Sequence, residues 1–219
     1  MRIMIFGDSN SWGYLDDGSG IRYAQRWPVV MKAGLESAGH GPVELVEECL
    51  PGRTSAYPDP QEGPEYNGQP YLRPALLSHA PLDWVLIMLG TNDCKTRFDA
   101  SSTDIAGHIA HLARSAARAP VGTGKWREAK APKVAVICPA NLGARADDPS
   151  WPRFQEWLGA REKLSHLPEN LEQALAGTGI PLLKAGDAAT PSMRDPIHLD
   201  ENSHQALGAH IAACLSDLM

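Results

Sequence analysis

The sequence predicts a three-layer α/β/α fold, in which a central five-stranded parallel sheet is covered by helices on both faces. Five short apolar runs, each bounded by turn residues, are spread along the 219 residues. Continuous apolar runs are typical of parallel strands that are buried on both sides. Segments with helical spacing lie between the runs, and this alternation favours a parallel sheet.

The expected strands follow one another along the whole chain. They cover residues 3–6, 43–46, 84–89, 134–138 and 181–183. The length fits one domain over residues 1–219, because single cores grow to roughly 250 residues before chains divide.

The helices are expected from apolar side chains that recur every three or four residues. A first helix contains Trp27 to Leu35, and a later one contains Ile105 to Ala116. A last helix is expected from about Glu201 to Leu218. Its inward face is predicted to carry Leu207, Ile211, Cys214, Leu215 and Leu218.

Three long polar segments interrupt this alternation, at residues 50–70, 119–132 and 141–151. Loops longer than about 12 to 15 residues in a compact domain are usually functional or disordered. We expect these segments to shape a pocket or a contact between subunits.

The composition indicates a globular protein that does not bind nucleic acid. Hydrophobic residues make up 43% of the chain and charged residues 21%, close to globular averages. Lys and Arg number 20 against 26 for Asp and Glu, a net charge of −6, and the basic residues are scattered. Nucleic-acid binding requires a clustered basic surface.

The cysteine spacing and the lengths of the apolar runs argue against a metal site, a membrane-spanning segment and a signal peptide. Cys49, Cys94, Cys138 and Cys214 are far apart and form no C-x-x-C pair, so they are expected to be buried or half-buried free thiols. The apolar run at residues 3–6 is too short for a signal peptide, and no run of about 20 apolar residues could span a membrane. A cytoplasmic location is predicted.

Four polar segments follow strands or precede the last helix, and these carry the candidate chemistry. They are Gly7-Asp8-Ser9, Leu50-Pro51-Gly52-Arg53, Gly90-Thr91-Asn92-Asp93 and Asp195-Pro196-Ile197-His198. In an open parallel sheet, ligands bind outside the carboxyl ends of the strands. We therefore expect these segments to converge.

Ser9 is the candidate nucleophile, with His198 as its base and Asp195 as the carboxylate that orients the base. A serine hydrolase requires these three groups. The backbone N–H groups of Ser9 and Gly52, with the side-chain amide of Asn92, are candidate donors to an oxyanion.

Each piece alone has a simpler explanation. Gly-Asp-Ser and Gly52 are common in turns, and Asn92 could cap a helix. His108 and His111 lie three residues apart on a helix but lack a third metal ligand, so a solvated face is expected. The same is expected of His204 and His210 on the last helix.

Taken together and in this order, the four segments resemble the SGNH subgroup of the GDSL esterases and lipases. The resemblance extends from Phe6 to His198. It implies a flavodoxin-like fold and no metal or cofactor. It also implies a catalytic triad of Ser9, Asp195 and His198, and an oxyanion hole of Ser9, Gly52 and Asn92.

Within that family, the chain looks most like the bacterial aryl esterase and acyltransferase branch. The likeness rests on Trp12-Gly13, Val46-Glu47-Glu48 and the stretch from Ile87 to Asp93. It implies hydrolysis of short-chain, acetyl-like aryl and alkyl esters, with acyl transfer to alcohols or peroxide in some members. It also implies a cytoplasmic homo-oligomer, which is an octamer in some members.

Four residues beside these motifs are expected to bind substrate. Asn10 stands where the family commonly has an apolar residue, which places an amide next to the site. Trp12 is the aromatic residue nearest to Ser9, and Ile197 lies between Asp195 and His198. Cys94 is either a pocket residue or an inert thiol. Further candidate pocket walls are Tyr57, Tyr66, Trp126 and Trp151.

Two alternative functions remain open. Carbohydrate acetylesterases share the four segments, so the substrate is alternatively an acetylated sugar. A non-catalytic protein could bind a small phosphorylated ligand at the same crevice. Against it, the turn after the first strand lacks further glycines and any Lys or Arg to cradle phosphate.

Overall fold

The computed structural model describes residues 1–124 and 129–219, and its centre is a five-stranded parallel sheet. The strands lie in the order β2-β1-β3-β4-β5. Their bounds are Arg2–Gly7 (β1), Glu44–Cys49 (β2), Trp84–Met88 (β3), Lys133–Cys138 (β4) and Leu182–Lys184 (β5). This is the flavodoxin-like order, in which the winding reverses between β1 and β3. The predicted fold class is confirmed.

The apolar strands form the sheet because both of its faces are covered. In β1, Ile3 pairs with Leu45 on one side and with Trp84 on the other. Successive side chains of a strand point to opposite faces, so Met4 and Phe6 enter one core while Ile3 and Ile5 enter the other.

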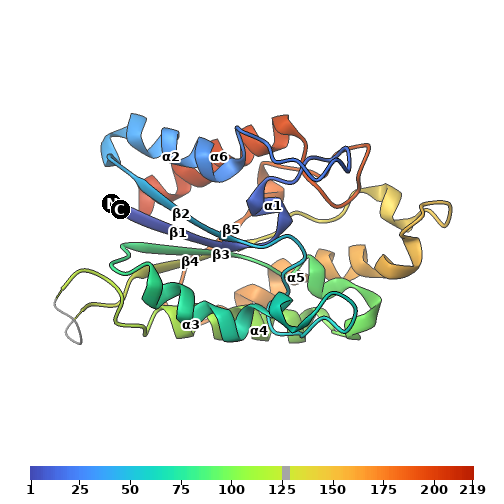
Figure 1. Cartoon of the computed structure of the whole chain (residues 1–219), viewed down its shortest axis with the longest axis horizontal. Helices are drawn as coiled ribbons and strands as arrows, with labels where there is room; N and C mark the ends of the chain where they lie inside the picture. The colour runs from blue at the N-terminus through green and yellow to red at the C-terminus, as the bar shows by residue number, and fades with distance from the viewer. Residues whose placement is uncertain (125–128) are drawn as a thin grey trace.

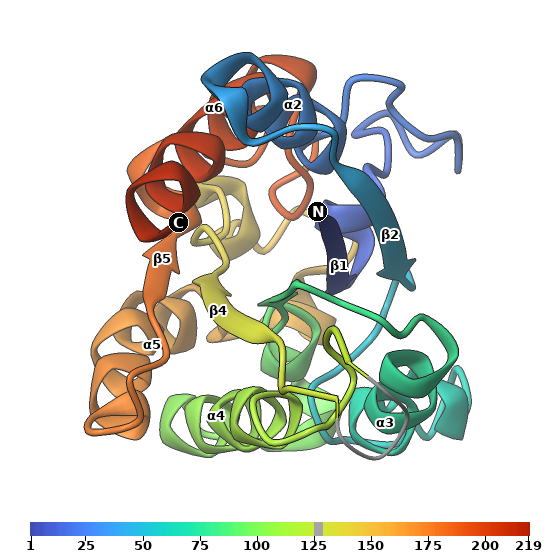
Figure 2. The ribbon, with the colours of Figure 1, turned by 90° about the vertical axis from the view of Figure 1, so that its left-hand side faces the viewer.

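The helices form one layer on each face of the sheet (Figures 1 and 2). One layer holds α2 (Trp27–Leu35) and α6 (Glu201–Leu218), and the other holds α3 (Gly68–Ser78), α4 (Ser102–Ala116) and α5 (Ala160–Leu175). A single turn, α1 (Ser9–Trp12), follows β1. Figure 1 shows α1 at the end of the sheet opposite the two chain termini.

Side-chain caps fix where several helices begin. Ser101 and Asp104 form a capping box at the start of α4, in which each side chain satisfies a backbone N–H of the other. The carboxylate of Asp200 accepts the Ser203 N–H at 2.7 Å and begins α6.

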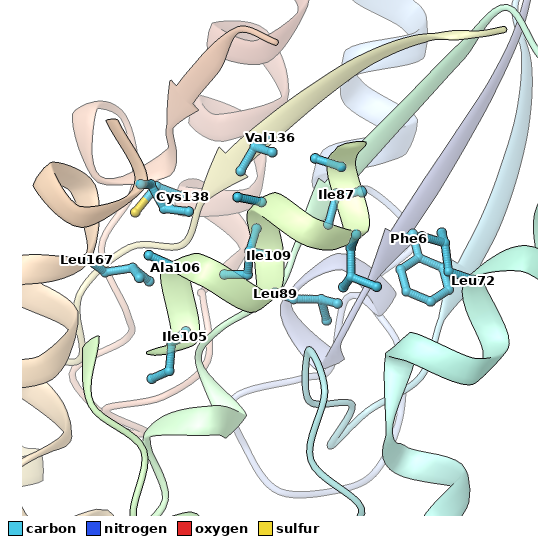
Figure 3. Close-up of a cluster of buried hydrophobic side chains, with 14 of the residues drawn as sticks. Phe6, Leu72, Ile87, Leu89, Ile105, Ala106, Ile109, Val136, Cys138 and Leu167 are labelled. Atoms are coloured by element: carbon cyan, nitrogen blue, oxygen red, sulfur yellow. The ribbon is translucent and has the colours of Figure 1, made fainter. Parts of the chain in front are cut away.

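The larger core lies between the sheet and α3, α4 and α5 (Figure 3). Phe6 and Ile87 from the sheet pack there with Ile105 and Ile109 of α4, all fully buried. On the other face, Ile5 and Trp27 pack with Leu207 and Ile211 of α6. The two cores hold the ends of β1 and β3 in fixed positions.

The last helix has the predicted bounds, but two of its side chains were placed wrongly. Leu207, Ile211 and Leu215 face inward as predicted, whereas Leu218 is 39% exposed because it lies in the final turn beside the chain end. His204 is fully buried and not on a solvated face. It accepts the Trp27 N–H at 3.3 Å, because α6 packs directly against the start of α2.

Burial of His204 lowers the pKa of its imidazole to about 4. Removal from water disfavours the charged form of a base. His204 is therefore neutral in the folded protein at neutral pH.

No helix within residues 1–124 and 129–219 is both long and apolar enough to cross a membrane.

Candidate active site

A tight turn brings Ser9 from the end of β1 to the start of α1. The turn requires glycine at position 7, since a Cβ atom there would lie 2.4 Å from Ser11 Oγ and 3.3 Å from the Met88 carbonyl oxygen. The carboxylate of Asp8 caps α1 by accepting the Asn10 N–H at 2.9 Å. Ser9 is consequently held as the first residue of α1, with 6% of its surface exposed.

The loop before α6 brings His198 and Asp195 to Ser9. His198 Nε2 lies 3.0 Å from Ser9 Oγ, and His198 Nδ1 lies 2.6 Å from Asp195 Oδ2. Both distances are those of hydrogen bonds. The three predicted triad residues are thus aligned in the order serine, imidazole, carboxylate, and their catalytic role stays a prediction.

Asp195 is held in its orientation by the backbone of its own loop. Its Oδ1 accepts the Ile197 N–H at 2.9 Å. Burial by itself raises the pKa of this carboxyl, but the hydrogen bond and the charge of His198, with the Ile197 N–H, outweigh burial and hold the pKa below its ordinary value. Asp195 is therefore a carboxylate at neutral pH and can accept the Nδ1–H of His198.

An aromatic ring also packs against the imidazole of His198. The ring of Tyr14 lies 4.6 Å from that of His198 at an angle of 31°. Further along the loop, the Ser192 N–H donates to the His198 carbonyl oxygen at 2.8 Å. The Tyr14 ring therefore restricts rotation of the imidazole, and the backbone hydrogen bond holds the loop that carries it.

Asn10 ties the His198 loop to the turn that carries Ser9. Its Nδ2 donates to the Ile197 carbonyl oxygen, and its Oδ1 accepts the Leu199 N–H, each at 3.1 Å. The side chain is 7% exposed. One amide therefore holds both peptide groups that flank His198.

Gly52 and Asn92 lie beside Ser9 on the loops after β2 and β3. Gly52 has φ of +90°, which favours glycine, and a Cβ atom there would lie 2.9 Å from the Tyr66 ring. Across the described part of the chain, the N–H groups of Ser9 and Gly52 donate no hydrogen bond. The amide of Asn92 donates to the Arg53 carbonyl oxygen at 3.2 Å and lies 3.5 Å from Asp8 Oδ2.

Two buried carboxyl groups, those of Asp8 and Asp93, lie next to the loops that carry these donors. Asp8 is 1% exposed, and burial raises the pKa of its carboxyl to about 6. Asp93 accepts hydrogen bonds from the Ser55 N–H, at 2.8 Å, and from the Ser55 hydroxyl. The hydrogen bonds between Ser55 and Asp93 join the loop that carries Gly52 to the loop that carries Asn92.

The predicted nucleophile, base and oxyanion donors open onto one cavity of about 280 Å³. Its lining includes Ser9, Gly52, Asn92 and His198. The volume lies near the lower end for small-molecule sites, which run from about 300 to 1,000 Å³. The arrangement suits a nucleophilic attack on a small substrate whose reacting atom gains negative charge.

The structure places some of the expected pocket residues at this cavity and others elsewhere. Ile197 and Tyr66 line it. Asn10 does not, because its amide is bonded to the His198 loop. Trp12 does not, because its ring packs under Arg22, whose guanidinium lies 5.2 Å from the ring centre. Both were placed wrongly in the pocket.

Of the two alternatives for Cys94, a pocket residue or an inert thiol, the structure favours the inert thiol. It is fully buried in the core beneath the Asn92 turn, and its Sγ lies 3.4 Å from the Gly90 carbonyl oxygen. Of the further aromatic candidates, Tyr57 and Trp151 pack in the same core. Trp126 lies outside the described residues.

Several cavity residues were not anticipated from the sequence. They are Tyr14, Lys95, Arg153 and Trp157, whereas Pro51 and Glu62 belong to residues 50–70, which were expected to shape a pocket or a contact between subunits. Lys95 follows the Asn92 turn directly, and this proximity was the one signal available. Arg153 and Trp157 come from the segment after residue 151, whose path no local pattern reveals.

Among the residues that the structure describes, no group of three or more His, Cys, Asp and Glu side chains is arranged to hold a metal ion.

Comparisons with known proteins agree with this geometry. Residues 5–206 match the model of the GDSL-like lipase/acylhydrolase family. No curated protein matches the chain by sequence.

Similar solved structures span the entire chain. An aryl esterase of M. smegmatis is 33% identical, and a carbohydrate acetylesterase of Sinorhizobium meliloti is 32% identical. Both give a TM-score of 0.88, with 100% of this chain and 99% of the other covered. A putative arylesterase of Agrobacterium tumefaciens is 32% identical, with a TM-score of 0.84 over 100% of this chain and 99% of the other.

Proposed function

The chain belongs to the GDSL-like lipase/acylhydrolase family, and we propose that it hydrolyses short-chain carboxylic esters with a triad of Ser9, His198 and Asp195. The observation that carries the proposal is the hydrogen-bonded series from Ser9 Oγ to His198 (3.0 Å) and on to Asp195 (2.6 Å). This series opens onto a cavity that also contains Gly52 and Asn92. The esterase structures at 32% and 33% identity support the reaction class.

The first step forms an acyl-enzyme. Ser9 Oγ attacks the ester carbonyl while His198 Nε2 accepts the serine proton, and Asp195 stabilises the resulting imidazolium. The N–H groups of Ser9 and Gly52 and the amide of Asn92 donate to the oxyanion. When the intermediate collapses, His198 returns the proton to the leaving alcohol.

The second step releases the acyl group. His198 accepts a proton from a water molecule, which attacks the acyl carbon, and the same donors stabilise the second oxyanion. The bond to Ser9 Oγ then breaks, and His198 reprotonates the serine. The free enzyme and a carboxylic acid remain.

Substitution of the nucleophile tests this proposal. Ser9→Ala is expected to abolish most turnover of p-nitrophenyl acetate while the protein stays folded. Ser115→Ala, at an exposed position of α4, is the matched control and is expected to keep full activity. Near-normal turnover by Ser9→Ala would exclude the mechanism.

Acyl transfer to alcohols is a further part of the proposal. The cavity contains apolar surface from Ile197 and Trp157 beside Ser9, on which the alkyl part of an alcohol can rest. In water with added short alcohols or hydrogen peroxide, the ratio of transfer product to free acid measures this activity. Formation of free acid alone would limit the enzyme to hydrolysis.

An acetylated carbohydrate is the second candidate substrate. The cavity lining is rich in side chains that form hydrogen bonds, including Tyr14, Glu62 and Tyr66, and sugar hydroxyls require such partners. Turnover of acetylated xylose compared with phenyl acetate distinguishes the two substrates. If a serine-reactive probe fails to label the protein, a non-catalytic binding function is favoured instead.

We also propose that residues 1–219 act as one catalytic domain within a homo-oligomer. The family resemblance supports self-association, and light scattering of the full chain measures it directly.

A further inference from the structure

The candidate active-site cavity carries an excess of positive charge. Three charged side chains line it, namely Glu62, Lys95 and Arg153. Glu62 and Arg153 are exposed at its rim, whereas Lys95 is only 5% exposed. The buried charge in the cavity wall is therefore a cation.

The ammonium group of Lys95 has a weak set of partners. Among the described residues it makes no hydrogen bond, and the nearest carboxylate oxygen, Glu156 Oε1, lies 3.8 Å away. Its other neighbour is the ring of Trp157, whose centre lies 5.5 Å from Nζ. Its three N–H donors have no acceptor among the described residues, and Nζ is not enclosed, so the ammonium group can be reached from the cavity.

Glu156 does not compensate the charge of Lys95 because it is already shared. Its Oε1 accepts from Arg97 Nη1 at 2.8 Å, and its Oε2 accepts from Arg153 Nε at 2.9 Å. Arg97 also donates to Asp59 Oδ2 at 2.6 Å. Three cations, Lys95, Arg97 and Arg153, thus share the carboxylates of Glu156 and Asp59, and Lys95 is the one that makes no hydrogen bond to either carboxylate.

A cation that is largely buried loses part of its hydration, which is unfavourable unless an acceptor replaces the lost water. Burial accordingly lowers the pKa of Lys95 from its ordinary value. The cation–π contact with Trp157 attracts the charge of Lys95 but supplies no hydrogen-bond acceptor. An anion that enters the cavity would supply the missing acceptor.

We propose that Lys95 binds a carboxylate group of the substrate, so that the preferred esters are anionic. This inference rests on the proposed esterase function and adds a substrate class to it. Lys95 ends the same turn that holds Asn92, since its N–H donates to the Asn92 carbonyl oxygen at 3.2 Å. One turn therefore supplies both an oxyanion donor and the anchor for the substrate charge.

Matched pairs of esters test the proposal. 4-Acetoxybenzoate and its neutral methyl ester differ by a carboxylate on the alcohol side, and monophenyl adipate and methyl phenyl adipate differ by one on the acyl side. The wild-type protein is expected to give a higher kcat/KM for the anionic member of one pair, through a lower KM. The pair that shows the preference identifies the side of the ester that faces Lys95.

Variants of Lys95 assign this preference to its charge. The ratio of kcat/KM for the anionic ester to that for the neutral ester is expected to fall at least about tenfold in Lys95→Met, because a hydrogen bond to a charged group is lost. Lys95→Arg is expected to retain most of the ratio. Lys133→Met, at the opposite end of the sheet in the first residue of β4, is the control and is expected to leave the ratio unchanged.

Inhibition of the wild-type protein gives a measurement that depends on no variant. Benzoate is expected to inhibit turnover of a neutral ester more strongly than benzamide does. An equal effect of the two inhibitors, with no anionic preference in either ester pair, would overturn the proposal. An unchanged ratio in Lys95→Met would also overturn it. If no ester is hydrolysed, neutral or anionic, the proposed esterase function itself fails.

Discussion

The amide of Asn10 provides the most specific prediction about how this site is positioned. In Asn10→Leu the side chain keeps a similar volume but loses its hydrogen-bonding groups. The variant removes the donor to the Ile197 carbonyl oxygen and the acceptor of the Leu199 N–H, both at 3.1 Å. These two peptide groups flank His198, so the variant tests whether the amide holds the base in place.

The cost follows from the burial of these groups. Asn10 is 7% exposed, and Ile197 and Leu199 are each 3% exposed, so water does not readily replace the lost partners. A buried polar group left without a partner costs about 1–3 kcal/mol, and two such groups therefore cost about 2–6 kcal/mol. We expect the free energy of unfolding to fall by an amount in this range, and kcat to fall at least about tenfold because His198 is less often within reach of Ser9.

Urea unfolding and steady-state hydrolysis of p-nitrophenyl acetate measure the two effects. Asn202→Leu makes the same change at an exposed position in the first turn of α6, and it is expected to alter the free energy of unfolding by less than about 0.5 kcal/mol. If Asn10→Leu loses stability but keeps the wild-type kcat, the amide is structural and does not position His198. If neither the free energy of unfolding nor kcat changes, the Asn10 amide does not hold the His198 loop.

Three other substitutions probe neighbouring parts of the site. Asn92→Ala is expected to lower kcat by about 10²–10³-fold with little change in KM, as for loss of an oxyanion donor; a change confined to KM would assign Asn92 to substrate binding. Gly7→Ala is expected to lower the free energy of unfolding by about 1–3 kcal/mol through overpacking against Ser11, and a denaturation midpoint equal to that of the wild type would contradict this. Asp8→Asn tests whether the titrations of Asp8 and His204 have opposite effects on the free energy of unfolding. His204 contributes stability above its unfolded pKa of 6.5 that is lost as the pH falls toward about 4, whereas Asp8 contributes stability below its unfolded pKa of 3.8 that is lost as the pH rises through about 6. Each titration is worth about 3 kcal/mol, so the two offset one another in the wild type. On lowering the pH from 6.5 to 4, the free energy of unfolding of Asp8→Asn, measured by urea unfolding, should fall by about 3 kcal/mol more than that of the wild type. Parallel pH profiles of the two proteins would refute this.

The fold was predictable because its signals are local and repeated. Each strand is a short apolar run with turn residues at both ends, and the last helix shows apolar side chains at intervals of three or four residues. The convergence of Ser9, Asn92 and His198 was also predictable, since the carboxyl ends of parallel strands meet at one edge of the sheet.

The direction of individual side chains was not predictable from the same signals. Asn10 and Trp12 are adjacent to Ser9 in sequence, but α1 is a single helical turn that sends consecutive side chains in different directions. The amide of Asn10 consequently meets the His198 loop and not the cavity. His204 was misplaced for a related reason, because its burial depends on the packing of α2 against α6.

The cationic wall of the cavity depends on long-range packing. Arg153 and Trp157 reach the site from the segment after residue 151, and their neighbours Lys95 and Arg97 come from the loop after β3. No periodic pattern links these two segments. Only the folded chain reveals that their charges meet beside Ser9.

The formation of an acyl-enzyme on Ser9 is the central claim, and peptide mass analysis tests it most directly. The protein is mixed with p-nitrophenyl acetate, stopped in acid during the first turnover and digested. We predict one acetyl group on the peptide that contains Ser9, and none in Ser9→Ala. An acetyl group on another residue, or wild-type turnover with no acetylated peptide, would contradict the account.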